Sequence, residues 1–121
     1  MSKFFKGVAA LVTAIGMILG LAACSPESVD MTKVTAVIDV RTPMEFSEGH
    51  LDGALNLDVQ GADFDAKVQQ LDPAGTYVVY CRSGNRSGQA IERMKAMGFT
   101  NLTNGGSVAD AASLTGLPVV Q

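Results

Sequence analysis

The sequence predicts a small α/β domain in which a mostly parallel central sheet is flanked by helices. Short apolar runs rich in β-branched residues alternate along the chain with segments of helical spacing. Pairs that contain glycine, proline or aspartate mark the boundaries between them. The chain has 121 residues, which is enough for one such domain, and we expect that domain to cover residues 34–121.

The first half of the predicted domain alternates two strands with two helices. Residues 35–40 are a short β-branched apolar run, which is typical of a buried strand. Threonine followed by proline predicts a helix over residues 42–49, because threonine caps helices and proline suits their first turn. An aspartate–glycine turn introduces a strand over residues 54–57. Apolar side chains at helical spacing predict a helix over residues 63–71, which aspartate–proline closes.

The second half contains the segment with the strongest strand composition, TYVVY at residues 76–80. A loop at residues 81–86 leads into a helix over residues 87–97, whose apolar side chains share one face and which ends at a glycine. A short strand at residues 101–103 and a helix at residues 108–114 follow. Ligands of parallel sheets bind at the carboxyl ends of strands, so the loop after residue 80 is the expected site.

The first 23 residues differ from the rest of the chain and resemble an export signal. Two lysines precede an uncharged run over residues 7–23. As a helix this run would be about 26 Å long, shorter than the roughly 30 Å hydrocarbon core of a bilayer. It ends in LAAC, which resembles the lipobox of bacterial lipoproteins. The resemblance implies removal of residues 1–23 and acylation of Cys24, with an uncleaved anchor as the alternative.

This interpretation predicts a lipid-anchored protein of the cell envelope that faces the periplasm or the outside of the cell. Its contact with the membrane would be the N-terminal lipid, and the polar residues 24–33 are expected to act as a tether. Without the leader, seven basic residues stand against twelve acidic ones, a net charge of −5. This acidic balance argues against nucleic acid as a partner.

Cys81 is the second of two cysteines. If Cys24 carries lipid, Cys81 has no partner for a disulfide, which is unusual in an exported protein. A free cysteine is often a small buried core residue, and this is one interpretation. The charged loop that follows Cys81 favours a reactive thiol instead.

The loop CRSGNR, residues 81–86, places this thiol between a buried strand and the start of a helix. Backbone N–H groups of a tight glycine-containing loop can converge on an anion, and the helix start adds partial positive charge. Arg82 and Arg86 add full charges, although Arg82 could equally be a solvated surface residue. Together these features are expected to lower the pKa of Cys81 below the free-cysteine value of about 8.5.

Three blocks of sequence, in this order, resemble the rhodanese (thiosulfate sulfurtransferase) family over roughly residues 34–120. Residues 37–41, VIDVR, resemble the first strand of that family. Residues 49–56, GHLDGALN, resemble its second block, and residues 81–86 resemble its active-site loop. The resemblance implies a rhodanese-like domain that accepts a sulfane sulfur on its loop cysteine as a persulfide.

The resemblance also implies roles for individual residues. Cys81 is the expected catalytic nucleophile. The residues expected to bind the anionic donor are Arg82, Ser83, Gly84, Asn85 and Arg86. Asp39, Arg41 and His50 are expected to be structural, since a lone histidine is more often part of the hydrogen-bonded framework than a general base. One histidine and two distant cysteines form no metal-binding pattern, and no cofactor is expected.

We therefore expect sulfane sulfur to move from a small anionic donor such as thiosulfate to a thiophilic acceptor such as a thiol or a thioredoxin-like protein. The alternative is a non-catalytic, tethered persulfide carrier or protein-docking module. Cell-cycle-type phosphatases and arsenate reductases of a related fold use Cys-x5-Arg, whereas only four residues separate Cys81 from Arg86. The shorter loop favours a sulfur atom over a tetrahedral phosphate.

Overall fold

The computed structural model describes residues 28–121, and it confirms the predicted α/β fold. The strands of the central sheet, in spatial order, are β3 (Leu55–Asn56), β1 (Ala36–Asp39), β4 (Thr76–Tyr80) and β5 (Asn101–Gly106). Every neighbouring pair in this sheet is parallel. The carboxyl ends of β1, β4 and β5 therefore meet along one edge, where the loop after β4 lies.

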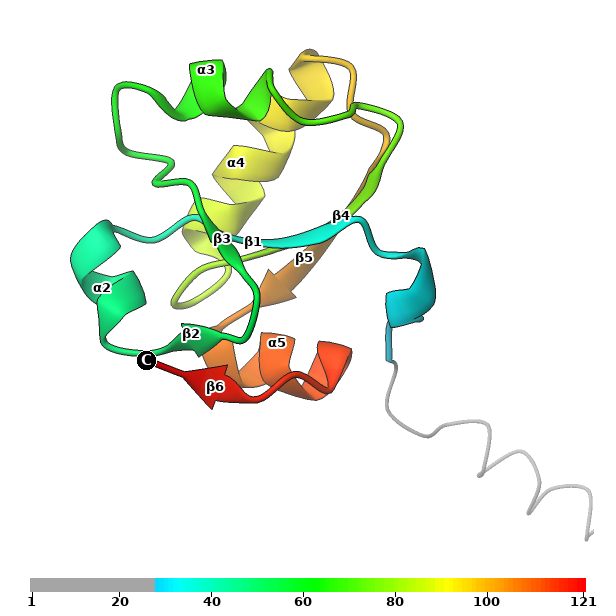
Figure 1. Ribbon diagram of the computed structural model, residues 1–121. Coiled ribbons are helices and arrows are strands. Elements are labelled where there is room, and N and C mark those ends of the chain that lie inside the picture. Colours follow the sequence, from blue (N-terminus) through cyan, green and yellow to red (C-terminus); the bar gives the residue numbers. More distant parts are fainter. Residues whose placement is uncertain (1–27) are drawn as a thin grey trace, which may run out of the picture.

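Helices cover both faces of the sheet (Figure 1). They are α2 (Pro43–Ser47), α3 (Phe64–Val68), α4 (Asn85–Ala96) and α5 (Val108–Thr115), and the 3₁₀ turn η1 (Met31–Lys33) precedes them. The core residues of α3 and α4 pack on one face, and those of α5 pack on the other. Two short strands that were not predicted, β2 (His50–Leu51) and β6 (Val119–Val120), pair antiparallel on the α5 side.

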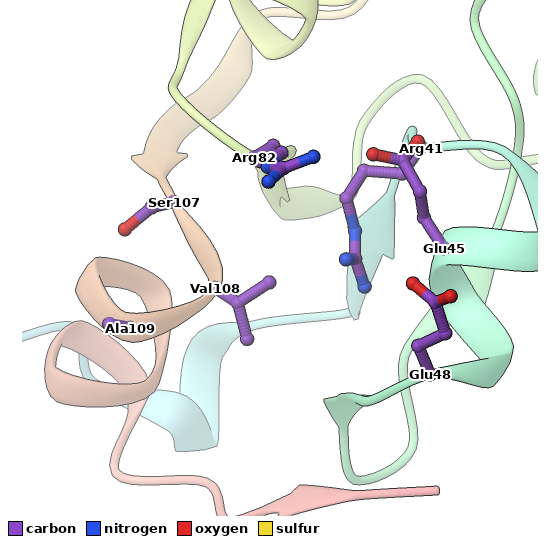
Figure 2. A pocket seen from close by; sticks show the side chains of 7 residues that line it. All are labelled: Arg41, Glu45, Glu48, Arg82, Ser107, Val108 and Ala109. Carbon is purple, nitrogen blue, oxygen red and sulfur yellow. The ribbon is translucent and has the colours of Figure 1, made fainter.

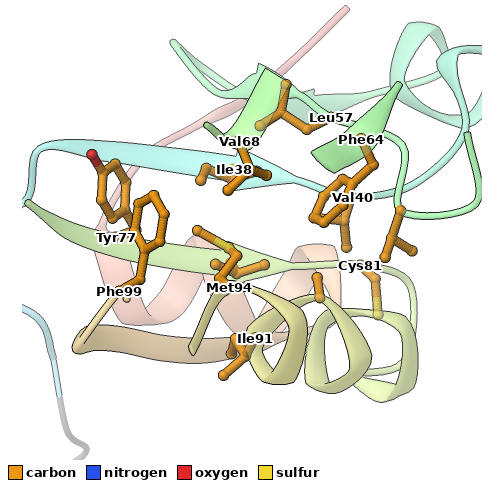
Figure 3. Packing of buried hydrophobic residues seen from close by; sticks show 13 residues of the cluster. Ile38, Val40, Leu57, Phe64, Val68, Tyr77, Cys81, Ile91, Met94 and Phe99 are labelled. Atoms are coloured by element: carbon orange, nitrogen blue, oxygen red, sulfur yellow. The ribbon is translucent and has the colours of Figure 1, made fainter. Parts of the chain in front are cut away.

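The side chains of β4 alternate between the two faces and thereby set the direction of the thiol. Tyr77 and Val79 belong to the core cluster shared with α3 and α4. Val78 and Tyr80 belong to the cluster shared with α5. Because side chains alternate along a strand, Cys81 continues the first series and faces α4. Figure 3 shows this cluster, with Cys81 beside the coils of α4.

Several boundaries differ from the sequence predictions. Helix α4 begins at Asn85 instead of Ser87, because Gly84 takes the N-cap position. Helix α3 ends at Val68, before its predicted end at residue 71. Strand β5 extends past residue 103 to Gly106, because it pairs with β4 over its length. The remaining predicted elements are present close to their expected bounds.

The described part of the predicted tether, residues 28–33, packs against the domain. Val29 and Met31 contact the core cluster on the α5 face. The N–H of Val29 also donates to the carbonyl of Leu114 at 3.0 Å. The folded domain thus begins earlier than predicted, while the predicted signal segment and Cys24 lie outside the described residues. Within residues 28–121, no helix has the length and apolar character needed to cross a membrane.

Candidate active site

Cys81 directly follows β4, and its side chain is fully buried at the start of α4. Its Sγ accepts a hydrogen bond from the N–H of Gly84 at 2.9 Å and lies 3.5 Å from Oγ of Ser87. Burial raises the pKa of Cys81, but hydrogen bonds from Ser87 and from the amides of Ser83 and Gly84 lower it more. The pKa of Cys81 therefore lies below its usual value, and the loop stabilises the thiolate, which is the nucleophilic form.

Gly84 allows the loop to turn its amide onto the sulfur. Its φ is +98°, in the left-handed region where a side chain would be strained. From this position the chain enters α4 at Asn85, so the N-terminus of a 12-residue helix lies beside Cys81. The partial positive charge of that helix end adds to the stabilisation of a sulfur anion.

Arg86 lies in the first turn of α4, not in the loop, and it forms an ion pair with Glu45 of α2. Nη1 and Nη2 donate to the two carboxylate oxygens at 2.7 and 2.9 Å. This hydrogen-bonded pairing with Arg86 lowers the pKa of Glu45 to about 2. The guanidinium groups of Arg82 and Arg86, both expected to bind the donor, are therefore not equivalent. That of Arg86 already has an anionic partner.

A pocket of about 320 Å³ lies at the edge where β1, β4 and β5 end. Its lining residues are Arg41, Glu45, Glu48, Arg82, Ser107, Val108 and Ala109 (Figure 2). Arg82 is exposed and takes part in no ion pair within residues 28–121. It is thus a cation that remains available to an anionic ligand. Cys81 does not line this pocket.

Asp39 and Arg41 form a buried ion pair at the end of β1. Nη2 of Arg41 lies 2.7 Å from Oδ2 of Asp39, and Nε donates to both carboxylate oxygens. The same Nη2 donates to the carbonyl of Gly49 at 2.6 Å. The pair therefore ties the end of β1 to the segment before β2.

His50 lies in the framework around α2. Its Nδ1 is 2.8 Å from the carbonyl oxygen of Phe46, and its ring stacks on the Phe46 ring with centroids 3.6 Å apart. These contacts hold the imidazole against Phe46 of α2. Ser83 and Asn85 are exposed. Across the described part of the chain, no group of three or more His, Cys, Asp or Glu side chains could hold a metal ion.

Two residues of the hydrogen-bonded network around the thiol were not identified from the sequence. Ser87 is fully buried beside Cys81, and its position directly after the predicted loop was a usable clue. Asn104 of β5 accepts from the Ser87 hydroxyl at 2.7 Å and donates to the carbonyl of Gly84 at 3.1 Å. Asn104 is 17 positions from Ser87, and only the pairing of β5 with β4 brings them together.

Comparison with known proteins gives consistent results. Residues 27–109 match the rhodanese-like domain family. The chain is 36% identical over 75 residues to the thiosulfate sulfurtransferase PspE of Escherichia coli K12, a match covering 62% of this chain and 72% of that protein. It is 33% identical over 91 residues to a sulfurtransferase of Allochromatium vinosum, covering 74% of this chain and 81% of that protein.

Among solved structures, a rhodanese from E. coli with anions aligns with a TM-score of 0.58 and 33% sequence identity. The alignment covers 71% of this chain and 96% of that chain. The named relatives support sulfurtransferase activity in general. Since the family match extends over more than half of the sequence and the relatives share about a third of the aligned residues, the chain belongs to the rhodanese-like domain family.

Proposed function

We propose that this rhodanese-like protein is a sulfurtransferase that carries a sulfane sulfur on Cys81 as a persulfide. The observation that carries the proposal is the hydrogen bond from the Gly84 amide to Sγ of Cys81, in a loop that lowers the pKa of this thiol. A sulfur so placed is an activated nucleophile. The name of the relative PspE, a thiosulfate sulfurtransferase, supports thiosulfate as the donor.

The proposed reaction has two half-reactions. The thiolate of Cys81 attacks the sulfane sulfur of thiosulfate, a new S–S bond forms, and the electron pair of the broken S–S bond leaves with sulfite. An acceptor thiolate then attacks the terminal sulfur of the protonated persulfide, and Cys81 leaves as the thiolate. The Gly84 amide and the start of α4 stabilise the anionic sulfur at both stages.

We assign donor binding to Arg82 in preference to Arg86. Arg82 lines the pocket and has no acidic partner within residues 28–121, whereas Arg86 is paired with Glu45. Arg82→Ala should lower kcat/KM for thiosulfate about ten- to a hundred-fold, the effect of losing one charge-assisted hydrogen bond. Lys95→Ala, at the far end of α4, is the control and should leave kcat/KM unchanged. Equal rates for the Arg82 variant and wild type would remove Arg82 from donor binding.

The burial of the Cys81 thiol is relevant to the alternative function, a persulfide carrier that does not turn over. Sγ is fully buried and does not line the pocket, so the residues that cover it must move before a donor can reach it. Slow opening would favour a carrier that loads once for a partner protein. Steady-state transfer from thiosulfate to a thiol acceptor, compared with the rate of single loading, separates the two.

The main test is the intact mass of the protein after incubation with thiosulfate. We expect a gain of one sulfur that peptide mapping localises to Cys81, and no gain in the Cys81→Ser chain. Addition of a small thiol should remove the sulfur. A gain of the same mass in the Cys81→Ser chain would contradict the assignment of the nucleophile.

We further propose that the protein is exported and anchored to a membrane through lipid on Cys24. The support is the run of residues 7–23 that ends in LAAC, directly before the polar segment that leads to the domain. Such an anchor would present the active site to the periplasm or to the outside of the cell. A small thiol or a thioredoxin-like protein in that compartment would then be the acceptor.

A further inference from the structure

The hydrogen bonds of Asn104 determine which way its amide points. Its Oδ1 accepts from the backbone N–H of Gly106 at 2.9 Å, and its Nδ2 donates to the carbonyl of Gly84 at 3.1 Å. A backbone N–H can only donate and a carbonyl can only accept. The oxygen of the amide therefore faces Ser87, and exchanging its nitrogen and oxygen would break both bonds.

This orientation constrains the hydroxyl proton of Ser87. The Ser87 Oγ lies 2.7 Å from Oδ1 of Asn104 and 3.5 Å from Sγ of Cys81. Both neighbours are acceptors when Cys81 is a thiolate, yet a hydroxyl has one proton to donate. Since Ser87 is fully buried, its proton goes to one of these two atoms.

We propose that Asn104 is a positioning residue, which competes with Cys81 for the hydroxyl proton of Ser87 and so limits how strongly Ser87 stabilises the sulfur anion. With the proton on Asn104, Oγ offers the sulfur only lone pairs and can accept from the thiol S–H. When the Ser87 hydroxyl instead donates its proton to Sγ, the hydroxyl stabilises the thiolate. Oδ1 of Asn104 then still accepts its hydrogen bond from the N–H of Gly106. The loop amides stabilise the anion in either orientation.

The charged groups around Cys81 are separate from this network. Arg86 on α4 interacts electrostatically with Cys81 but is paired with Glu45 of α2, and Arg82 is the residue that follows Cys81 in the chain. Asp39 and Arg41 form their own pair at the end of β1. Strand β5 carries no charged residue. A change at Asn104 therefore alters the hydrogen bonding of Ser87 without removing a charge.

The test is a pH titration of the ultraviolet absorbance of the thiolate in the full chain, with the Cys81→Ser chain as the background for Cys24. Asn104→Ala frees the hydroxyl to donate to Sγ, and we expect the midpoint to fall by about one pH unit, the size of a hydrogen bond to a charged group. In the Ser87→Ala background the same substitution should have no effect. This dependence on Ser87 distinguishes positioning from a general loosening of the loop.

Asn101→Ala is the matched control, because Asn101 is an exposed asparagine at the other end of β5 and should leave the midpoint unchanged. Asn104 is itself exposed, so its truncation leaves no buried cavity, and Asn104→Ser serves as a second variant too short to reach Ser87. An unchanged or raised midpoint in Asn104→Ala, or an equal shift with and without Ser87, would overturn the proposal. The proposal for Asn104 rests on the proposed function only in taking Cys81 as the nucleophile. Because the titration needs no sulfur donor, failure of this proposal can be distinguished from failure of sulfur transfer.

Discussion

Arg86 and Glu45 connect the start of α4 to α2 through two parallel hydrogen bonds, Nη1 to Oε1 at 2.7 Å and Nη2 to Oε2 at 2.9 Å. Their side chains are only 20% and 21% exposed. Glu45 also accepts from the backbone N–H of Thr42 and so completes the capping box of α2. One carboxylate therefore supports both the start of α2 and the helix whose N-terminus faces Cys81.

Arg86→Ala should act on the whole domain instead of on one donor. Loss of this bidentate, partly buried pair is expected to reduce the free energy of unfolding by about 1–2 kcal/mol. The value of kcat/KM should fall alike for thiosulfate and for a neutral or protein-borne sulfur donor. Denaturant unfolding and kinetics with both donors measure this, with Lys95→Ala as an exposed control. A loss confined to the anionic donor would return Arg86 to donor binding.

The low pKa of Glu45 makes the contribution of this pair depend on pH. Glutamate in an unfolded chain titrates near about 4.3, and the folded pKa is about 2. Because the folded value is depressed, the stabilisation is complete above the unfolded pKa and is lost as the pH falls towards the folded one. The difference in free energy of unfolding between wild type and Glu45→Gln should be constant above about pH 5.5 and shrink between about pH 5 and 2.

Urea unfolding at a series of pH values tests this dependence. Glu92→Gln is a suitable control, since the Glu92 side chain is 76% exposed in its pair with Lys95 and should show little difference at any pH. A difference for Glu45→Gln that does not change with pH would mean that Glu45 acts through its shape or its cap bonds and not through its charge.

The buried pair of Asp39 and Arg41 should respond more strongly to the loss of one partner. Arg41→Met leaves the Asp39 carboxylate, which is 0% exposed, without its counter-ion. Such losses cost about 3–5 kcal/mol, and replacing both residues by apolar ones should recover part of this. Denaturant unfolding of the two variants gives the comparison. The folded fraction of Arg41→Met should still load sulfur on Cys81, and a folded but unloaded variant would contradict a purely structural role.

Cys24→Ala tests the proposed lipid anchor. We expect the variant to be misprocessed or released from membranes, because the acyl chains are the attachment that we propose for the domain. Membrane fractionation and the intact mass of the mature chain measure both effects. Cys81→Ser, which keeps Cys24, is the control and should stay in the membrane fraction. A Cys24→Ala chain that fractionates with membranes at the mass of wild type would exclude lipid on Cys24.

Much of the fold is readable from local patterns in the chain. The run TYVVY predicts β4 because residues buried on both faces leave a continuous apolar segment, and the structure places it at the centre of the sheet. The same holds for α4, whose apolar face was visible at helical spacing. The strands β2 and β6 were not predictable in this way, because two-residue strands are too short to show a period.

Local sequence patterns place Cys81 directly after a buried strand, in a short loop that contains glycine and leads to a helix. These are local properties, and they suffice to propose Cys81 as the nucleophile, whereas the resemblance to the family rests on three separate blocks of sequence. The tertiary structure alone decided the partners of the polar groups. Arg86 meets Glu45 41 positions away, and Asn104 reaches Ser87 and the carbonyl of Gly84 only through the register of β4 and β5. The residue type sets how many hydrogen bonds a side chain can donate or accept. The pairing of strands and the packing of helices then determine which atoms lie close enough to form those bonds.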